Sequence, residues 1–108
     1  MDYSDRFESI ERKMAEVESL SKDIDKKIAD IVERLIEHNC PECYSEKFFV
    51  SSNECSLAWV NGDLFIRFED CSRSSLLRCR YDFKYEAIKN IGLLFDVIEK
   101  ILDNEIDR

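Results

Sequence analysis

The feature that most constrains this sequence is a run of apolar residues spaced alternately three and four apart over residues 3–35. This spacing places the side chains on one face of an α-helix and is typical of a coiled-coil seam. Residues 1–39 contain no glycine or proline and carry 11 acidic against 7 basic residues. We therefore expect a long amphipathic helix that self-associates. The predicted oligomerisation residues are Phe7, Ile10, Met14, Val17, Ile24, Ile28, Ile31 and Leu35.

The charges beside the seam favour a parallel arrangement of the helices. In a parallel pair Arg6 meets Glu11 of the other copy, and Lys13 meets Glu18. An antiparallel pair would bring like charges together. Each exposed pair contributes only about 0.2–1 kcal/mol, so the bias is small. The charge pattern predicts a parallel homodimer, and isoleucine at the d positions also allows three or four strands.

A helix that packs against its own domain would show almost the same apolar stripe. However, 36 helical residues are about 54 Å long, whereas a domain of about 70 residues has a radius of gyration of about 11 Å. The helix must therefore overhang its domain. Besides self-association, a bent or hairpin helix within one chain and a partner helix from another protein remain open.

The remaining residues, 40–108, form the second of two predicted regions, a small domain that follows the helix of residues 1–39. Asn39 and Pro41 end the helix. Asn61-Gly62 between alternating apolar runs is the preferred turn of a two-residue β-hairpin. With that turn at the centre, the inward-facing pairs are Trp59 with Leu64, Leu57 with Ile66 and Cys55 with Phe68.

Other patterns complete the expected fold. Residues 48–50 form a short apolar run before a turn, and residues 77–83 alternate as a further strand would. From about Tyr85 to Ile106 the apolar spacing becomes helical again. The predicted class is α+β: a long N-terminal coiled-coil helix, a three- to four-stranded antiparallel β-meander, and a C-terminal helix packed on the sheet.

Composition excludes several functions. A net charge of -8 disfavours direct binding to nucleic acid or anionic lipid, because such binding depends on lysine and arginine. The longest apolar runs are far shorter than the roughly 20 residues of a membrane span. The acidic N-terminus lacks a signal-peptide pattern, so we expect a cytoplasmic protein with five reduced cysteines.

Chemistry-bearing residues are few. Cys40 and Cys43 have the spacing of a zinc knuckle, with Cys71 and His38 as possible completing ligands. A second close cysteine pair is missing, so no cofactor is expected and zinc remains an alternative. His38 is the only histidine; Cys40 is the only nucleophile that the sequence places beside it, and no third group is available to position the pair. We therefore expect a protein that is not an enzyme.

A contact surface is predicted on the outer face of the sheet. Aromatic and arginine side chains are the usual anchors of protein interfaces. The predicted partner-binding residues are Phe49, Phe65, Arg67, Arg78 and Arg80.

These features together predict a non-enzymatic, acidic protein-interaction module. Its expected role is a homo-oligomeric inhibitor or adaptor that binds a basic, nucleic-acid-binding protein. In size and charge alone, with no shared motif, it is similar to phage-encoded anti-defence inhibitors such as anti-CRISPR proteins. The alternatives are a chaperone-like or structural dimer that uses the apolar sheet face, and a small zinc-stabilised module.

Overall fold

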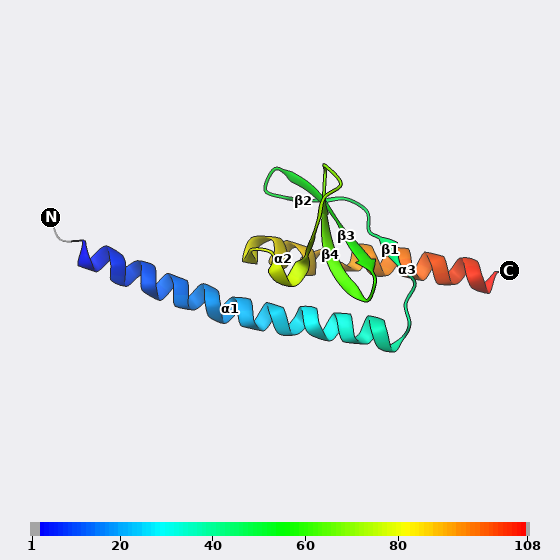
Figure 1. The fold of residues 1–108 in the computed structure, drawn as a ribbon, viewed down its shortest axis with the longest axis horizontal. Coiled ribbons are helices and arrows are strands. Elements are labelled where there is room, and N and C mark those ends of the chain that lie inside the picture. Colours follow the sequence, from blue (N-terminus) through cyan, green and yellow to red (C-terminus); the bar gives the residue numbers. More distant parts are fainter. Residues whose placement is uncertain (1–2, 108) are drawn as a thin grey trace.

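A computed structural model describes residues 3–107 of the chain (Figure 1). It has the predicted α+β architecture, in an elongated shape of 72 × 29 × 19 Å. The elements are, in order, α1 (Ser4–Glu37), β1 (Cys43–Tyr44), β2 (Phe48–Val50), β3 (Asn53–Val60), β4 (Asp63–Phe68), β5 (Arg73–Ser75), the 3₁₀ turn η1 (Leu76–Arg78), α2 (Tyr81–Lys89) and α3 (Ile91–Ile106).

Helix α1 is one continuous helix of 34 residues, and it ends where the sequence predicts. Asn39 adopts a left-handed conformation with φ of 49°. This lets the N–H of Cys40 donate to the carbonyl of Leu35 at 3.1 Å and that of Asn39 to Ile36 at 3.0 Å. These bonds satisfy carbonyl groups that the end of a helix leaves unpaired.

The antiparallel sheet is centred on the β3–β4 hairpin. Its register pairs Trp59 with Leu64, Leu57 with Ile66 and Cys55 with Phe68, which confirms the predicted pairs. Asn61 and Gly62 have φ of 54° and 72°, as a turn with two left-handed residues requires. Strand β5 pairs with the outer edge of β4.

The other edge of β3 pairs with two short strands, β1 and β2, which brings the sheet to five strands. Ser45 lies between them, and its side chain takes the place of a ladder partner. The N–H of Leu57 donates to Ser45 Oγ at 2.8 Å, and the N–H of Ser45 donates to the carbonyl of Leu57 at 2.8 Å. The interrupted edge therefore keeps its backbone groups paired.

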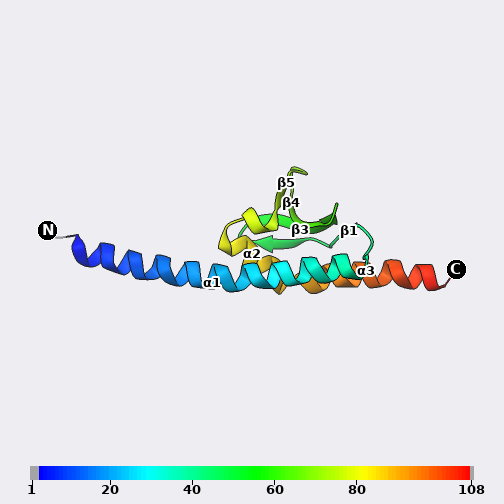
Figure 2. The ribbon, with the colours of Figure 1, turned by 60° about the horizontal axis from the view of Figure 1, so that its bottom comes forward.

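All three helices lie on one side of the sheet (Figure 2). Between them and the sheet is the core, which includes Ile28, Leu57, Leu64, Ile66, Leu76, Leu94 and Ile98. The C-terminal helix packs against the sheet as predicted, since α3 contacts β1 and β3.

Two local predictions were wrong. The alternating residues 77–83 form no strand: they pass from η1 into α2, and the fourth strand of the meander path is β5 at Arg73–Ser75.

The tail is two helices and not one, because Asn90 ends α2 and its side-chain amide donates to the carbonyl of Glu86 at 2.8 Å. Helix α2 begins four residues earlier than expected, at Tyr81, with Asp82 in its first turn. An acidic side chain there is favoured by the helix dipole.

Candidate interaction surfaces

The N-terminal half of α1 extends beyond the rest of the fold, as the length argument predicted (Figures 1 and 2). We call residues 4–20 of α1 the overhang. Its apolar stripe, together with the preceding Tyr3, is open to solvent. The exposed fractions are 57% for Tyr3, 62% for Phe7, 49% for Ile10, 61% for Met14, 47% for Val17 and 43% for Leu20. Contiguous exposed apolar surface of this kind is typical of interaction sites.

The C-terminal half of the same seam is used inside the chain. Ile24, Ile28 and Leu35 are buried, and Ile31 is half-buried against the same core. These four predicted oligomerisation residues are therefore unavailable to a second chain. The four that remain available, Phe7, Ile10, Met14 and Val17, all lie on the overhang.

The outer face of the sheet has no helix over it (Figure 2). Ala58 lies on this face between Tyr44 and Phe65, its partners on the two neighbouring strands, and is completely buried. The Arg67 guanidinium lies 5.1 Å from the ring centre of Tyr44, and that of Arg73 lies 5.3 Å from the ring centre of Phe65. Aromatic rings and arginines, in cation–π contact, thus take the place of a covering helix.

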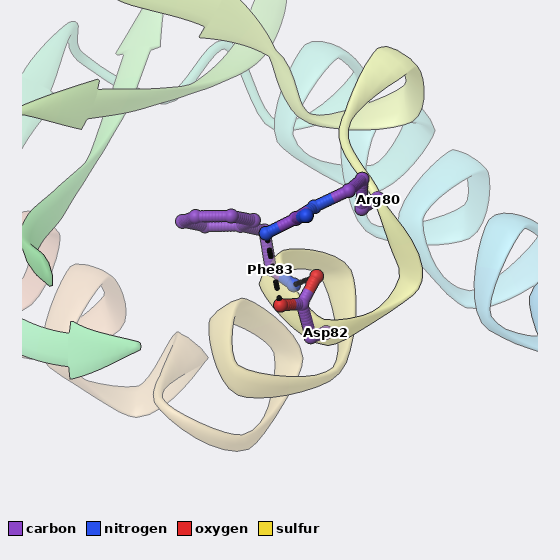
Figure 3. Close-up of polar contacts among 3 residues, drawn as sticks. All are labelled: Arg80, Asp82 and Phe83. Atoms are coloured by element: carbon purple, nitrogen blue, oxygen red, sulfur yellow. Dashed lines mark hydrogen bonds and ion pairs between the residues drawn. The ribbon is translucent and has the colours of Figure 1, made fainter. Parts of the chain in front are cut away.

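Beside this face, β5, η1 and the start of α2 enclose an open groove of about 660 Å³. Its charged lining consists of Arg73, Arg78 and Arg80 with a single carboxylate, Asp63. Figure 3 shows Arg80 above Phe83, with its guanidinium 5.5 Å from the ring centre and its Nη2 3.4 Å from Asp82 Oδ2. A locally basic, aromatic groove therefore lies on a chain of net charge -8.

The structure brings only some of the predicted partner-binding residues together. Phe65, Arg78 and Arg80 share the groove. Arg67 lies elsewhere, where its Nη2 donates to Cys71 Sγ at 3.3 Å, and Phe49 is 63% exposed on the edge strand β2. Arg78 and Arg80 were expected on a strand face, but they lie in η1 and at the start of α2.

Sequence reasoning missed three residues of these surfaces: Tyr44, Arg73 and Phe83. Tyr44 belongs to a two-residue strand, which is too short to show the alternation of apolar and polar residues that is typical of a strand. Arg73 belongs to the three-residue strand β5, which the sequence did not predict, and Phe83 was expected in a strand. The helical spacing of Phe83 and Ala87 was the available signal for Phe83, because both pack against the core.

The predicted zinc ligands do not converge. Cys40 and Cys43 lie near the turn end of the β3–β4 hairpin, with Cys43 paired to Trp59. Cys71 lies near the other end of the hairpin, where its N–H donates to the carbonyl of Phe68. Among residues 3–107 there is no group of three or more histidine, cysteine or acidic residues arranged to hold a metal ion.

Burial disfavours the thiolate form of three of the cysteines. It raises the pKa of Cys43, with a further contribution from the neighbouring Cys40. Burial likewise raises the pKa of Cys55 and Cys79. A raised thiol pKa opposes thiolate formation, and the thiolate is both the zinc ligand and the nucleophile.

A second, more apolar groove of about 420 Å³ separates the C-terminal part of α1 from α3. Ile31, Leu35, Phe95 and Ile98 supply its apolar lining, and His38 lies at its rim with Asp30, Arg34 and Glu99. His38 is exposed, so the only histidine lies on the surface.

Comparisons with known proteins found no similar protein: no family model, curated protein or solved structure matches this chain. Within residues 3–107, the helices all lack the combination of length and apolar character that a membrane crossing needs.

Proposed function

We propose that this chain is a non-enzymatic protein-interaction module that self-associates through the overhang and binds a basic partner protein through the acidic helix α3. The observation that carries the proposal is the exposed stripe of six large apolar residues from Tyr3 to Leu20. A solvated helix face is normally polar. Leaving this stripe in water is unfavourable by roughly 25 cal/mol per Å², so covering it stabilises an assembly.

The acidic charge supports the second part of the proposal. Helix α3 carries Asp96, Glu99, Asp103 and Glu105 against one lysine, Lys100. Its C-terminal end extends away from the sheet, opposite to the overhang (Figure 1). An acidic helix in this position fits a basic groove of a nucleic-acid-binding protein, which the chain would occupy as an inhibitor or adaptor.

Light scattering of the reduced protein over a range of concentrations tests self-association. We expect a mass of at least twice the 12.8 kDa of one chain. Met14→Glu places a charge in the stripe and should shift the protein to monomer. Ser19→Glu is the matched control, because Ser19 is exposed on the opposite face of the same helix. A monomeric wild-type protein, or equal behaviour of the two variants, would contradict the proposal.

Affinity capture at two salt concentrations tests the basic partner. At about 1 M salt the Debye length falls to about 3 Å, so a charge-driven partner is released. Reversing two charges of α3, in Asp103→Lys with Glu105→Lys, should abolish capture. Reversing Glu8 and Glu16 on the polar side of the overhang should preserve it. Captured proteins that are acidic, or that resist both salt and charge reversal, would argue against this role.

The outer sheet face favours a second candidate, a structural or chaperone-like dimer. Phe49 and Tyr44 are 63% and 46% exposed on a face without a helix. Binding through these rings would tolerate salt and fail in Phe49→Asp, whereas Ser52→Asp in the adjacent turn would leave it intact. This pattern distinguishes the second candidate from the first.

A further inference from the structure

The stripe of the overhang and the core contacts of α1 lie on the same face of one helix. At 3.6 residues per turn, the positions from Phe7 to Val17 point in nearly the same direction as Ile24, Ile28 and Leu35. The first set is exposed and the second is buried against the chain's own domain. The domain therefore lies on the side to which the stripe points, immediately beyond Leu20.

This arrangement limits how two copies can pair. Helix axes in contact are about 8–10 Å apart, whereas one helix with its side chains is about 10–12 Å thick. In a parallel pair, Ile24 and Ile28 of both copies would stand at the same level. Both domains would then need the space between the two helices. Helix α1 has no break between Ser4 and Glu37 that would let the two helices diverge.

An antiparallel pair avoids this overlap. The overhang of the second copy then lies along the overhang of the first, from the level of the first copy's Leu20 back to the level of its Tyr3. The N-terminal end of the second copy stops where α2 of the first copy begins to cover α1. Lys84 of α2 marks that boundary, because its Nζ lies 2.7 Å from Asp25 Oδ1. The overhang is about 25 Å long, which is the length that the two copies can share.

We propose that two copies of this chain pair through their overhangs in an antiparallel arrangement centred near Arg12, with Ile10 of one copy against Met14 of the other and Phe7 against Val17. This inference rests on the proposed self-association and specifies its geometry. The stripe offers roughly 1,000 Å² for a pair, which is the lower limit for a specific interface. A weak, concentration-dependent dimer is therefore expected.

The charge pattern opposes this geometry only slightly. In the antiparallel pair Lys13 faces Lys13 of the other copy, and Glu11 faces Glu11. A parallel pair would instead match opposite charges. Exposed charge pairs contribute about 0.2–1 kcal/mol each. Overlap of two folded domains is prohibitive in comparison, so the position of the domain decides the orientation.

Small-angle X-ray scattering of the reduced wild-type protein tests the proposal, with the mass measured on the same sample. Antiparallel copies that share only the overhang extend to about 120 Å, well beyond the 72 Å of one chain. A dimer with a maximum dimension near 75 Å would overturn the antiparallel geometry but leave self-association intact. A monomer at all concentrations would overturn both.

Cysteine cross-linking gives an independent measurement. Ile10→Cys and Met14→Cys are prepared separately, each with Cys71→Ser to remove the exposed native thiol. In the antiparallel pair a cysteine at position 10 is about 6 Å along the axis from its own counterpart, too distant for a disulfide once the lateral separation is added. We expect a disulfide-linked dimer only when the two variants are mixed. Cross-linking of either variant with itself would show a parallel pair and overturn the proposal.

Discussion

Lys84 Nζ donates a hydrogen bond to Asp25 Oδ1 at 2.7 Å, joining α2 to α1 across 59 positions of sequence. The side chain of Lys84 is only 9% exposed, whereas that of Asp25 is 41% exposed. With Phe7, Met14 and Ile28 at the a positions of the heptad, Asp25 occupies an e position, where a coiled coil would direct its charge at another chain. In this fold the carboxylate of Asp25 binds a lysine of its own chain, at the point where α2 begins to cover α1.

The two partners of this ion pair should respond differently to removal. Asp25→Ala leaves a nearly buried ammonium group without its counter-charge, so the free energy of unfolding should fall by about 1–3 kcal/mol. Lys84→Met keeps the aliphatic packing and leaves only a partly solvated carboxylate, so the loss should stay below about 1 kcal/mol. Urea unfolding of both variants measures the difference. Equal losses would contradict the role of burial.

Ser45 should be important for the sheet edge. In Ser45→Ala the N–H of Leu57 loses the oxygen that accepts its hydrogen bond. An unpaired buried donor costs about 1–3 kcal/mol, so the free energy of unfolding should fall by that amount. The control is Ser52→Ala in the exposed β2–β3 turn, which should change stability by no more than about 0.5 kcal/mol. The prediction fails if the two variants unfold at the same urea concentration.

The two glycines should give effects of opposite sign when each is replaced by alanine. Gly62 has φ of +72°, a conformation that costs a side-chain-bearing residue about 1–2 kcal/mol. Gly92 lies in α3, and an added Cβ would meet nothing within 4 Å. Gly62→Ala should therefore lower the melting temperature, whereas Gly92→Ala should raise it through the better helix propensity of alanine. Calorimetry measures the melting temperature of both variants. Changes of the same sign in the two variants would contradict the prediction.

Alkaline pH should destabilise the fold through its buried thiols. Burial raises the pKa of Cys43 and Cys55 above the ordinary value of 9.0. A proton that is held more tightly in the folded chain contributes stability at low pH. That contribution is complete below pH 9 and is lost as the pH rises through the folded-state pKa values.

Urea unfolding between pH 8 and pH 10 measures this loss. Cys43→Ala and Cys55→Ala should each show a shallower decline with pH than the wild-type protein. Ser52→Ala in the exposed β2–β3 turn provides the control, since it removes no thiol and should keep the wild-type slope. Parallel curves for all the variants would mean that the buried thiols do not titrate in this range.

The sequence by itself determined the features that depend on local periodicity and turn chemistry. The end of α1 just before Asn39 and the register around Asn61-Gly62 follow from the conformations that these few residues favour. The overhang also followed from the sequence, because helix length exceeds the size of a small domain. The strand expected at residues 77–83 was wrong, because alternation over seven residues does not exclude a helix whose start has its own charge signal at Asp82.

Only the tertiary structure decided which half of the seam is buried within the chain and which half stays exposed. A heptad pattern states which face of a helix is apolar, but an identical stripe forms whether a sheet or a second helix covers it. Ile28 and Met14 occupy the same a position of the repeat, yet Ile28 is completely buried and Met14 is 61% exposed. The groove of Arg73, Arg78 and Arg80 likewise required the fold, since β5, η1 and α2 meet there through long-range packing that local sequence does not encode.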